Sequence, residues 1–231
     1  MLRLEALEIA QGAFRLTADL AVETGATVAV IGPSGAGKST LLSVIAGFLP
    51  PASGRVLWQG QDITDRPPGE RPVSMIFQDN NLFPHLTAFQ NAALGLRPSL
   101  RLSTEERKRV ALALARVGLE GFGERRPGQL SGGQQSRVAL ARMALSGRPL
   151  ALLDEPFAAL GPALRAEMLD LVADLAREEG TTLLIVTHDP RDAERIAGQT
   201  ILVAEGRAAP PADTHALLSA PPPVLQEYLG K

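Results

Sequence analysis

A glycine-rich segment constrains this chain more than any other stretch of its sequence. The segment follows the apolar run at residues 27–31, precedes a helical pattern, and reads Gly32-Pro33-Ser34-Gly35-Ala36-Gly37-Lys38-Ser39-Thr40. It matches the pattern G-x-x-x-x-G-K-[ST], whose glycines let backbone N–H groups converge on phosphate oxygens at the N-terminus of a helix. In this pattern the lysine reaches the β- and γ-phosphates of a nucleotide and the next hydroxyl holds Mg²⁺. The segment therefore predicts a cradle for nucleotide phosphates, with Lys38 and Ser39 in those two roles.

Strands and helices are expected to alternate along the chain. Residues 2–9 and 14–22 have the pattern of a hairpin that leads into a strand at 27–31. Further strands are expected at residues 54–58, 73–77, 150–154, 181–186 and 200–204, and helices at 38–47, 103–117 and 162–178 and from about 133. The apolar strands at 73–77, 150–154 and 181–186 are expected to be buried. This order predicts an α/β fold with a parallel sheet, to which the early hairpin adds an antiparallel part. The Ala- and Leu-rich stretch from 87 to about 147 predicts a helical insert.

Composition excludes several classes of function. The 231 residues are 45% hydrophobic, which is enough for one large domain or two modest ones. A net charge of −2 with both signs dispersed argues against a nucleic-acid surface, which needs a concentrated basic face. The absence of cysteine excludes thiol catalysis and disulfides and fits a reducing compartment. No apolar stretch approaches the roughly 18 residues of a membrane span, and no signal peptide is recognised, so a cytoplasmic protein is expected.

Two adjacent carboxylates end the buried strand expected at residues 150–154. Asp154 and Glu155 follow four apolar residues, and ligand chemistry in open α/β sheets gathers at the carboxyl ends of the strands. Beside a phosphate cradle, Asp154 can accept a hydrogen bond from a water on Mg²⁺, and Glu155 can orient or deprotonate an attacking water. Alone this pair is a weak signal, but the cradle upstream makes it a candidate catalytic site.

The stretch Leu130-Ser131-Gly132-Gly133-Gln134 precedes the helix expected from about residue 133 and has two interpretations. Ser131 and Gln134 have the spacing of a capping box, S-x-x-Q, which is a purely structural role. Two consecutive glycines are poor for a mere cap, however, and they allow close backbone approach to an anion at the helix N-terminus. The residues alone leave both interpretations open.

Five landmarks, in this order, resemble the ATP-binding-cassette (ABC) ATPase family. They are the cradle at 32–40, Gln78 after the strand at 73–77, the LSGGQ signature at 130–134, LLDEP at 152–156, and His188 after the strand at 181–187. The resemblance covers residues 1 to about 210 and implies a P-loop NTPase core with an antiparallel β subdomain and a helical subdomain. It implies a single ABC ATPase domain at 1–231, whose parts are a core at about 1–86 and 148–210, a helical subdomain at about 87–147 and C-terminal helices at 211–231.

The same resemblance implies ligands, partners and residue roles. ATP and Mg²⁺ would bind in a head-to-tail homodimer, in which the cradle of one copy faces the signature of the other, at Ser131, Gly132, Gly133 and Gln134. Glu155 would be the catalytic base, His188 a γ-phosphate contact and Gln78 a metal and water sensor. Mg²⁺ would be held by Ser39, Gln78 and Asp154. The partners would be a membrane-embedded permease and, indirectly, a periplasmic substrate-binding protein, with the chain at the cytoplasmic face of the bacterial inner membrane.

Residues 71–87, with 46–49 and 51–54, more narrowly resemble the ATPase subunit of bacterial thiamine importers. This resemblance implies import of thiamine or its phosphates, and importers of ferric iron, sulfate, molybdate and polyamines are the alternatives. A soluble ABC ATPase of DNA repair or translation, or a module without hydrolysis, is less favoured, because the cassette occurs once and has no long insertion. Phe83 and Phe89 either line a groove for a permease helix or pack a short helix.

Two positions depart from the family pattern. The family places an aromatic residue near position 11 to stack on adenine, where this chain has Gln11, and Phe14 is expected in the next strand. The family also has an aspartate that connects the two nucleotide sites, where this chain has Gly161. These departures predict weak ATP affinity and low basal turnover.

Overall fold

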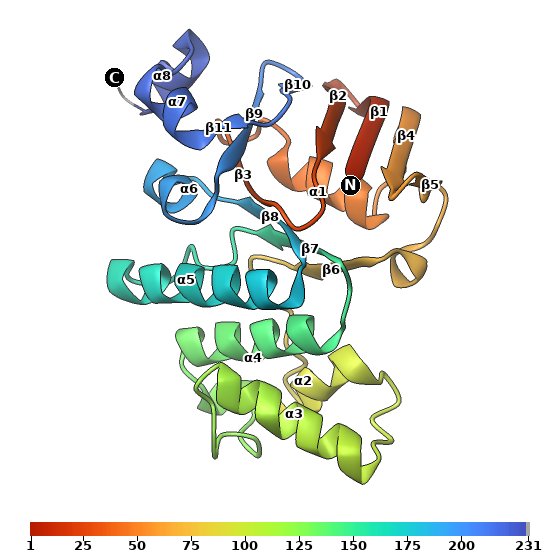
Figure 1. Cartoon of the computed structure of the whole chain (residues 1–231), viewed down its shortest axis with the longest axis vertical. Helices are drawn as coiled ribbons and strands as arrows, with labels where there is room; N and C mark the ends of the chain where they lie inside the picture. The colour runs from red at the N-terminus through yellow and green to blue at the C-terminus, as the bar shows by residue number, and fades with distance from the viewer. Residues whose placement is uncertain (230–231) are drawn as a thin grey trace.

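The computed structural model describes residues 1–229, and within them eleven strands form one sheet (Figure 1). The strands lie in the order β5-β4-β1-β2-β10-β9-β3-β8-β7-β6, and β11 pairs with β9. Their bounds are β1 Leu2–Gln11, β2 Phe14–Val22, β3 Thr27–Ile31, β4 Ser53–Trp58, β5 Gln61–Asp62, β6 Val73–Ile76, β7 Leu150–Asp154, β8 Thr182–Val186, β9 Gln199–Ala204, β10 Arg207–Ala208 and β11 Ala212–Asp213. Residues 230 and 231, which end the segment expected to hold the C-terminal helices, lie outside the described residues.

Helices cover the sheet and form a further layer beneath it (Figure 1). Their bounds are α1 Lys38–Ala46, α2 Ala88–Leu96, α3 Thr104–Arg116, α4 Gly132–Leu145, α5 Pro162–Glu179, α6 Pro190–Ile196, α7 Thr214–Ser219 and α8 Pro223–Leu229. In Figure 1, α4 and α5 lie below the sheet, and α2 and α3 lie below α4. Helices α2, α3 and α4 pack against one another, so the stretch at 87–147 is helical as expected. The division of the chain into subdomains remains a prediction.

The sheet has the mixed pairing that the sequence predicts. Strands β6, β7, β8, β3 and β9 pair in parallel, whereas β1 pairs antiparallel with both β2 and β4. Every residue of β8 is buried, as expected for a strand with helices on both faces. The expectation of a buried strand at 73–77 is wrong: only Ile76 of β6 is buried, because β6 forms the edge of the sheet and has a neighbouring strand on one side only.

The two faces of the central strands line different apolar clusters. Leu150 and Leu152 of β7 pack with α1 and the antiparallel strands. Ala151 and Leu153 point to the other face and pack with α2, α4 and α5. This alternation follows the two-residue period of a strand and places α1 on one face of the sheet and α4 and α5 on the other. The cradle therefore runs from a strand buried on both faces into a helix buried against the core.

The helices of the lower layer begin at defined residues. Three capping boxes start α2, α3 and α4, and their residue pairs are Thr87–Gln90, Ser103–Glu106 and Ser131–Gln134. The capping interpretation of the stretch at 130–134 is thereby confirmed.

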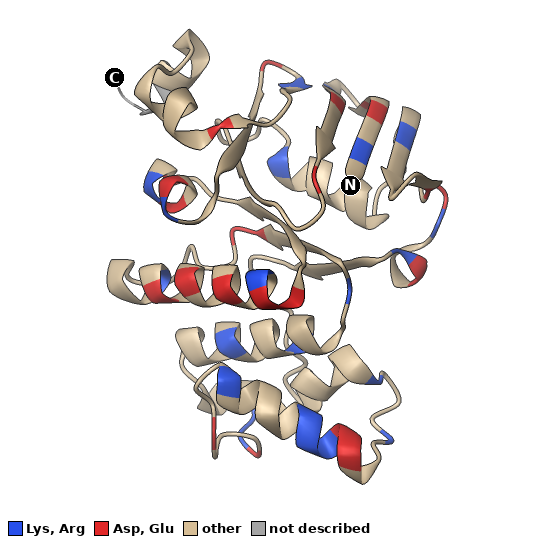
Figure 2. Cartoon of the chain, in the orientation of Figure 1, with Lys and Arg blue, Asp and Glu red and all other residues tan. Residues whose placement is uncertain are grey.

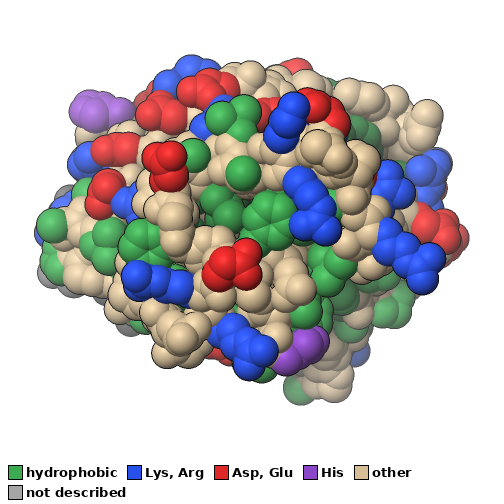
Figure 3. All heavy atoms as spheres, turned by 90° about the horizontal axis from the view of Figure 1, so that it is seen from below, with side chains coloured by type: hydrophobic (Ala, Val, Ile, Leu, Met, Phe, Trp, Pro, Cys, Tyr) green, Lys and Arg blue, Asp and Glu red, His purple; other side chains and the backbone are tan. Residues whose placement is uncertain are grey.

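Seen from below, this layer carries apolar side chains in a central hollow, with charged side chains between and around them (Figure 3).

Charged residues are spread over the whole fold. Figure 2 shows Lys and Arg interspersed with Asp and Glu, and acidic residues recur along α5. The dispersal agrees with the sequence, whose net charge is −2. Between residues 1 and 229, no helix combines the length and the apolar character needed to cross a bilayer.

Candidate functional site

The cradle forms the expected strand–loop–helix unit, because one loop joins β3 directly to α1. Two of its glycines are required by space as well as by backbone conformation. A Cβ on Gly32 (φ 149°) would lie 1.9 Å from Val203 O. A Cβ on Gly37 (φ 101°) would lie 2.5 Å from Phe14 Cζ. A larger residue at either position would have to displace these neighbours and adopt a backbone conformation that only glycine adopts easily.

Lys38, the first residue of α1, is buried within the cradle. Its Nζ donates to the carbonyl oxygens of Gly32 and Pro33, each at 2.9 Å. Burial lowers the pKa of the Lys38 ammonium, and the carboxylates of Glu155 and Asp154 oppose that shift. No side chain caps α1, so the loop places a cation beside a helix N-terminus with free N–H groups. This is the combination that binds phosphate.

The hydroxyl of Ser39 joins the cradle to the carboxylates. Ser39 Oγ donates to Asp154 Oδ1 at 2.9 Å, although the two residues lie 115 positions apart in the sequence. Burial raises the pKa of the Asp154 carboxyl, and the hydrogen bond from Ser39 opposes the shift. A hydroxyl and a carboxylate in contact fit Mg²⁺, which takes oxygen ligands and usually needs only one or two carboxylates beside substrate phosphates and water. Accordingly, the described part of the chain holds no group of three His, Asp or Glu side chains that could enclose a metal alone.

Gln78 lies at the same edge of the sheet as Asp154. It follows β6, which pairs in parallel with β7, so both residues are at the carboxyl ends of neighbouring strands. The side chain of Gln78 is exposed, and within residues 1–229 no hydrogen bond links it to Ser39 or Asp154. The structure thus brings Ser39 and Asp154 together, while the part of Gln78 in a metal site remains a prediction.

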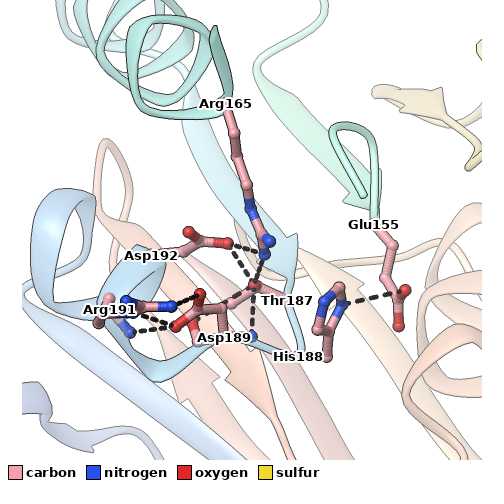
Figure 4. Close-up of polar contacts among 7 residues, drawn as sticks. All are labelled: Glu155, Arg165, Thr187, His188, Asp189, Arg191 and Asp192. Carbon is pink, nitrogen blue, oxygen red and sulfur yellow. Dashed lines mark hydrogen bonds and ion pairs between the residues drawn. The ribbon is translucent and has the colours of Figure 1, made fainter. Parts of the chain in front are cut away.

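Glu155 and His188 approach each other across the ends of β7 and β8 (Figure 4). His188 Nδ1 lies 3.5 Å from Glu155 Oε2, and the exposed fractions of the two side chains are 50% and 27%, respectively. Glu155 has a left-handed backbone (φ 45°), which costs energy for a residue with a side chain and is common at functional sites. Its N–H donates to Val186 O at 3.2 Å, which holds the turn against β8. The structure therefore places the candidate base beside the candidate phosphate contact.

Three polar residues that sequence reasoning missed lie behind His188 (Figure 4). Arg165 of α5 donates to Thr187 Oγ1 at 3.1 Å and forms an ion pair with Asp192 of α6. Thr187 and Asp192 are both buried. One signal could have revealed Arg165: a cation near the start of a helix opposes the helix dipole, so it usually has a local anion.

The signature residues start α4 and have a structural role in this chain. Gln134 N donates to Ser131 Oγ at 3.3 Å, and Ser131 N donates to Gln134 Oε1 at 2.9 Å. Gly133 is buried, and a Cβ there would lie 2.6 Å from Leu164 Cδ2 of α5, so a larger residue would force that side chain to move. Ser131 and Gly132 are exposed. No hydrogen bond among the described residues joins this stretch to the cradle of the same chain.

The two departures from the family pattern lie at the surface. Gln11 is exposed at the end of β1, opposite Phe14, which begins β2 as expected and lies against the cradle at Gly37. Gly161 is the N-cap residue of α5, with φ −64° and ψ 158°, and no side chain caps that helix. A Cβ on Gly161 would have no neighbour within 4 Å, so the position has room for a side chain.

Comparisons with known proteins show what the whole chain is similar to. Residues 17–158 match the family described as ABC transporter. The chain is 61% identical to the thiamine import ATP-binding protein ThiQ of Ruegeria sp. (strain TM1040) and 62% identical to ThiQ of Cereibacter sphaeroides, with 100% of each chain covered in both cases. A dimeric ATP-binding cassette in a post-hydrolysis state, bound to ADP and Pi, is similar in structure (TM-score 0.79, 31% identity, 93% of this chain and 99% of that chain). A nucleotide-free ATP-binding cassette from an ABC transporter is similar as well (TM-score 0.87, 26% identity, 100% and 99%).

Proposed function

The chain belongs to the ABC transporter family, and on this premise we propose that it is the ATP-hydrolysing subunit of a membrane importer for thiamine or its phosphates. Two relatives similar over their full lengths are thiamine import ATP-binding proteins, which favours this cargo over ferric iron, sulfate, molybdate or polyamines. One structural observation carries the ATPase assignment: the 2.9 Å hydrogen bond from Ser39 to Asp154. It joins the phosphate cradle to the pair of carboxylates, so binding and chemistry can occur at one place.

The cradle is proposed to bind the triphosphate of ATP. Backbone N–H groups of residues 32–40 and the ammonium of Lys38 supply the positive charge, and the phosphates replace the carbonyl oxygens that Lys38 now contacts. Ser39, Asp154 and Gln78 are the proposed residues for Mg²⁺, which when bound neutralises charge on the phosphates.

Glu155 is proposed to act as the general base. It accepts a proton from a water molecule while the water oxygen forms a bond to the γ-phosphorus. The bond between that phosphorus and the β–γ bridging oxygen breaks, which leaves ADP and inorganic phosphate. His188 is within 3.5 Å of Glu155, and we propose that its ring binds the γ-phosphate.

A head-to-tail homodimer is proposed to complete each site. Ser131 and Gly132 are exposed at the N-terminus of α4, where the Gly132 N–H and the serine hydroxyl can donate to an anion. In the head-to-tail arrangement this end of α4 faces the cradle of the second copy, and the γ-phosphate that these residues bind belongs to that copy. The dimeric cassette with bound ADP and Pi, which is 31% identical to this chain, supports the arrangement.

The permease is proposed to dock on aromatic residues near Gln78. Phe48 and Phe83 have exposed fractions of 56% and 47%, and the ring centroids of Phe48 and Phe77 are 5.4 Å apart. Exposed apolar side chains of this size favour a protein partner, and Phe77 is adjacent to Gln78 in the chain. Phe89 is only half-buried at the surface of the helical cluster and packs against it, which favours the packing interpretation for that residue.

Docking on a permease would place the chain at the cytoplasmic face of the membrane, with a periplasmic binding protein acting through the permease. The test is reconstitution with the permease encoded beside this chain. ATP hydrolysis is measured while binding proteins loaded with thiamine, ferric iron, sulfate or putrescine are added in turn. We expect stimulation by the thiamine-loaded protein alone, because a ligand shifts an equilibrium only through its differential affinity for two states. Stimulation by another cargo and none by thiamine would refute the cargo assignment, and no ATP hydrolysis under any condition would refute the ATPase assignment.

A further inference from the structure

We propose that Arg165 is a positioning residue, which holds His188 beside Glu155. The inference rests on the proposed function, because it concerns the same hydrolysis reaction. Arg165 lies in the first turns of α5 and is linked to the segment of His188 through Thr187 (Figure 4). It acts through a short series of largely buried hydrogen bonds, which runs through Thr187 to the backbone N–H of Asp189, the residue after His188 (Figure 4).

This series of hydrogen bonds begins at the Arg165 guanidinium, which lies between α5, α6 and the end of β8. Arg165 Nη2 pairs with Asp192 Oδ2 and donates to Thr187 Oγ1 at 3.1 Å. Thr187 Oγ1 donates in turn to the same Asp192 oxygen at 2.5 Å. The exposed fractions of the Arg165 and Asp192 side chains are 15% and 11%, so water does little to screen or replace these contacts.

The series of hydrogen bonds continues from Thr187 to the backbone next to His188. The N–H of Asp189 donates to Thr187 Oγ1 at 3.1 Å, so the hydroxyl of the residue before the histidine holds the backbone of the residue after it. Asp189 is held as well, because its carboxylate caps α6 by accepting from Arg191 N at 3.0 Å. The direction in which the His188 ring leaves the backbone is therefore set by Thr187, whose hydroxyl is oriented by Arg165 and Asp192.

Arg165 also connects to the segment that carries Glu155. Its backbone N–H donates to Gly161 O at 2.9 Å, at the end of the loop that runs from Glu155 to the start of α5. The N-cap residue Gly161 offers no side chain to this turn. That backbone bond belongs to the first turn of α5 and does not depend on the side chain, so the Arg165 guanidinium ties the start of α5, and with it the loop after β7, to Thr187 after β8.

A second ion pair between the same helices supplies a matched control. Arg195 of α6 binds Asp170 of α5 through two hydrogen bonds, at 2.7 and 2.5 Å. Both side chains are about half exposed, with exposed fractions of 44% and 51%, and the pair does not touch Thr187. If Arg165 only held α5 against α6, loss of Arg195 should have a similar effect. If Arg165 positions His188, only its own loss should change catalysis.

The experiment measures ATP hydrolysis by the full chain in the reconstituted transporter, with kcat and KM determined separately. Arg165→Met should lower kcat about 10-fold or more and leave KM for ATP within about twofold, because misplacing a reacting group by a fraction of an ångström to 1 Å can cost up to about 10²-fold. Arg195→Met should leave both constants unchanged. In a His188→Ala background, followed in single-turnover assays, Arg165→Met should cause no further loss, because it acts through the missing ring.

Thr187→Val provides an independent variant that keeps the charges of Arg165 and Asp192 and removes only the hydroxyl. It should reproduce the fall in kcat even if Arg165→Met does not fold. Wild-type kcat in either variant, equal losses in Arg195→Met, or additive losses in the His188→Ala background would overturn the inference. These outcomes leave the proposed function intact, since that function is tested by hydrolysis in the wild-type chain and by its loss in Glu155→Gln.

Discussion

Ser131 has two separable roles, a structural one in the cap of α4 and a proposed one in binding phosphate, and two substitutions distinguish them. Ser131→Ala removes the oxygen that accepts from Gln134 N at 3.3 Å and so removes half of the capping box of α4. Loss of such a cap costs about 1 kcal/mol of the free energy of unfolding. For a chain of this size, that loss lowers Tm by roughly 2 to 4 °C. Ser131→Asp keeps an acceptor at the N-cap and adds a negative charge that the helix dipole favours, so Tm should stay at or above the wild-type value.

ATP hydrolysis should be lower in Ser131→Asp than in Ser131→Ala, although Tm should be higher in Ser131→Asp. The aspartate would face the γ-phosphate held by the second copy, and repulsion between like charges should lower ATP hydrolysis by about 10²-fold or more, while the alanine variant should retain a larger part of the activity. Tm is measured by calorimetry without nucleotide, and hydrolysis by phosphate release. An aspartate variant with wild-type hydrolysis would refute the proposed contact with phosphate. An alanine variant with unchanged Tm would refute the structural role of the cap.

Two further predictions concern Asp154 and Gly161. Burial raises the pKa of Asp154 above its ordinary 3.8, so the folded state binds this proton more tightly than the unfolded state, and the stability contributed by Asp154 falls as the pH rises from 3.8 through the folded pKa. Asp154→Asn should therefore raise Tm of the nucleotide-free protein at pH 7 and abolish that pH dependence while it weakens Mg²⁺-dependent ATP binding; an unchanged Tm–pH profile would contradict this. Gly161→Asp has room for its side chain and supplies the missing cap of α5, so it should raise Tm slightly, by about 1 °C for a few tenths of a kcal/mol. In the assembled transporter it should also raise the Hill coefficient for ATP, and an unchanged coefficient would show that the two sites do not communicate through this position.

Much of the fold could be predicted because its strands carry strong local signals. The apolar runs that became β7 and β8 are buried on both faces, and glycines mark the ends of α1 and α5. Strand β6 has a similar apolar sequence, yet only one of its residues is buried, because it has a neighbouring strand on one side only. The sequence of a strand does not reveal whether it has one neighbour or two. How much of that strand is buried therefore depends on its position in the strand order of the sheet.

Some residues of the candidate site could likewise be predicted from the sequence, and others could not. Lys38, Ser39 and the carboxylate pair follow from motifs, and the hydrogen bond from Ser39 to Asp154 confirms that these motifs meet. Arg165 could not be assigned a role in advance, because its contacts depend on how α5 packs against α6 and the end of β8. The sequence likewise left Gly133 as a candidate phosphate contact, and only the structure shows that it also packs against Leu164, whose side chain would have to move for a larger residue.

Glu155 is proposed to activate water in a site that a second copy of the chain completes. The most direct test is the size of Glu155→Gln in sedimentation with and without ATP, combined with ATP binding and hydrolysis by the same protein. We expect ATP to bind and to convert the variant to a stable dimer, while hydrolysis falls by about 10²-fold or more. Lys38→Ala, as the control, should lose ATP binding and stay monomeric under the same conditions. A Glu155→Gln chain that hydrolyses ATP at the wild-type rate, or that binds ATP and remains a monomer, would contradict the claim.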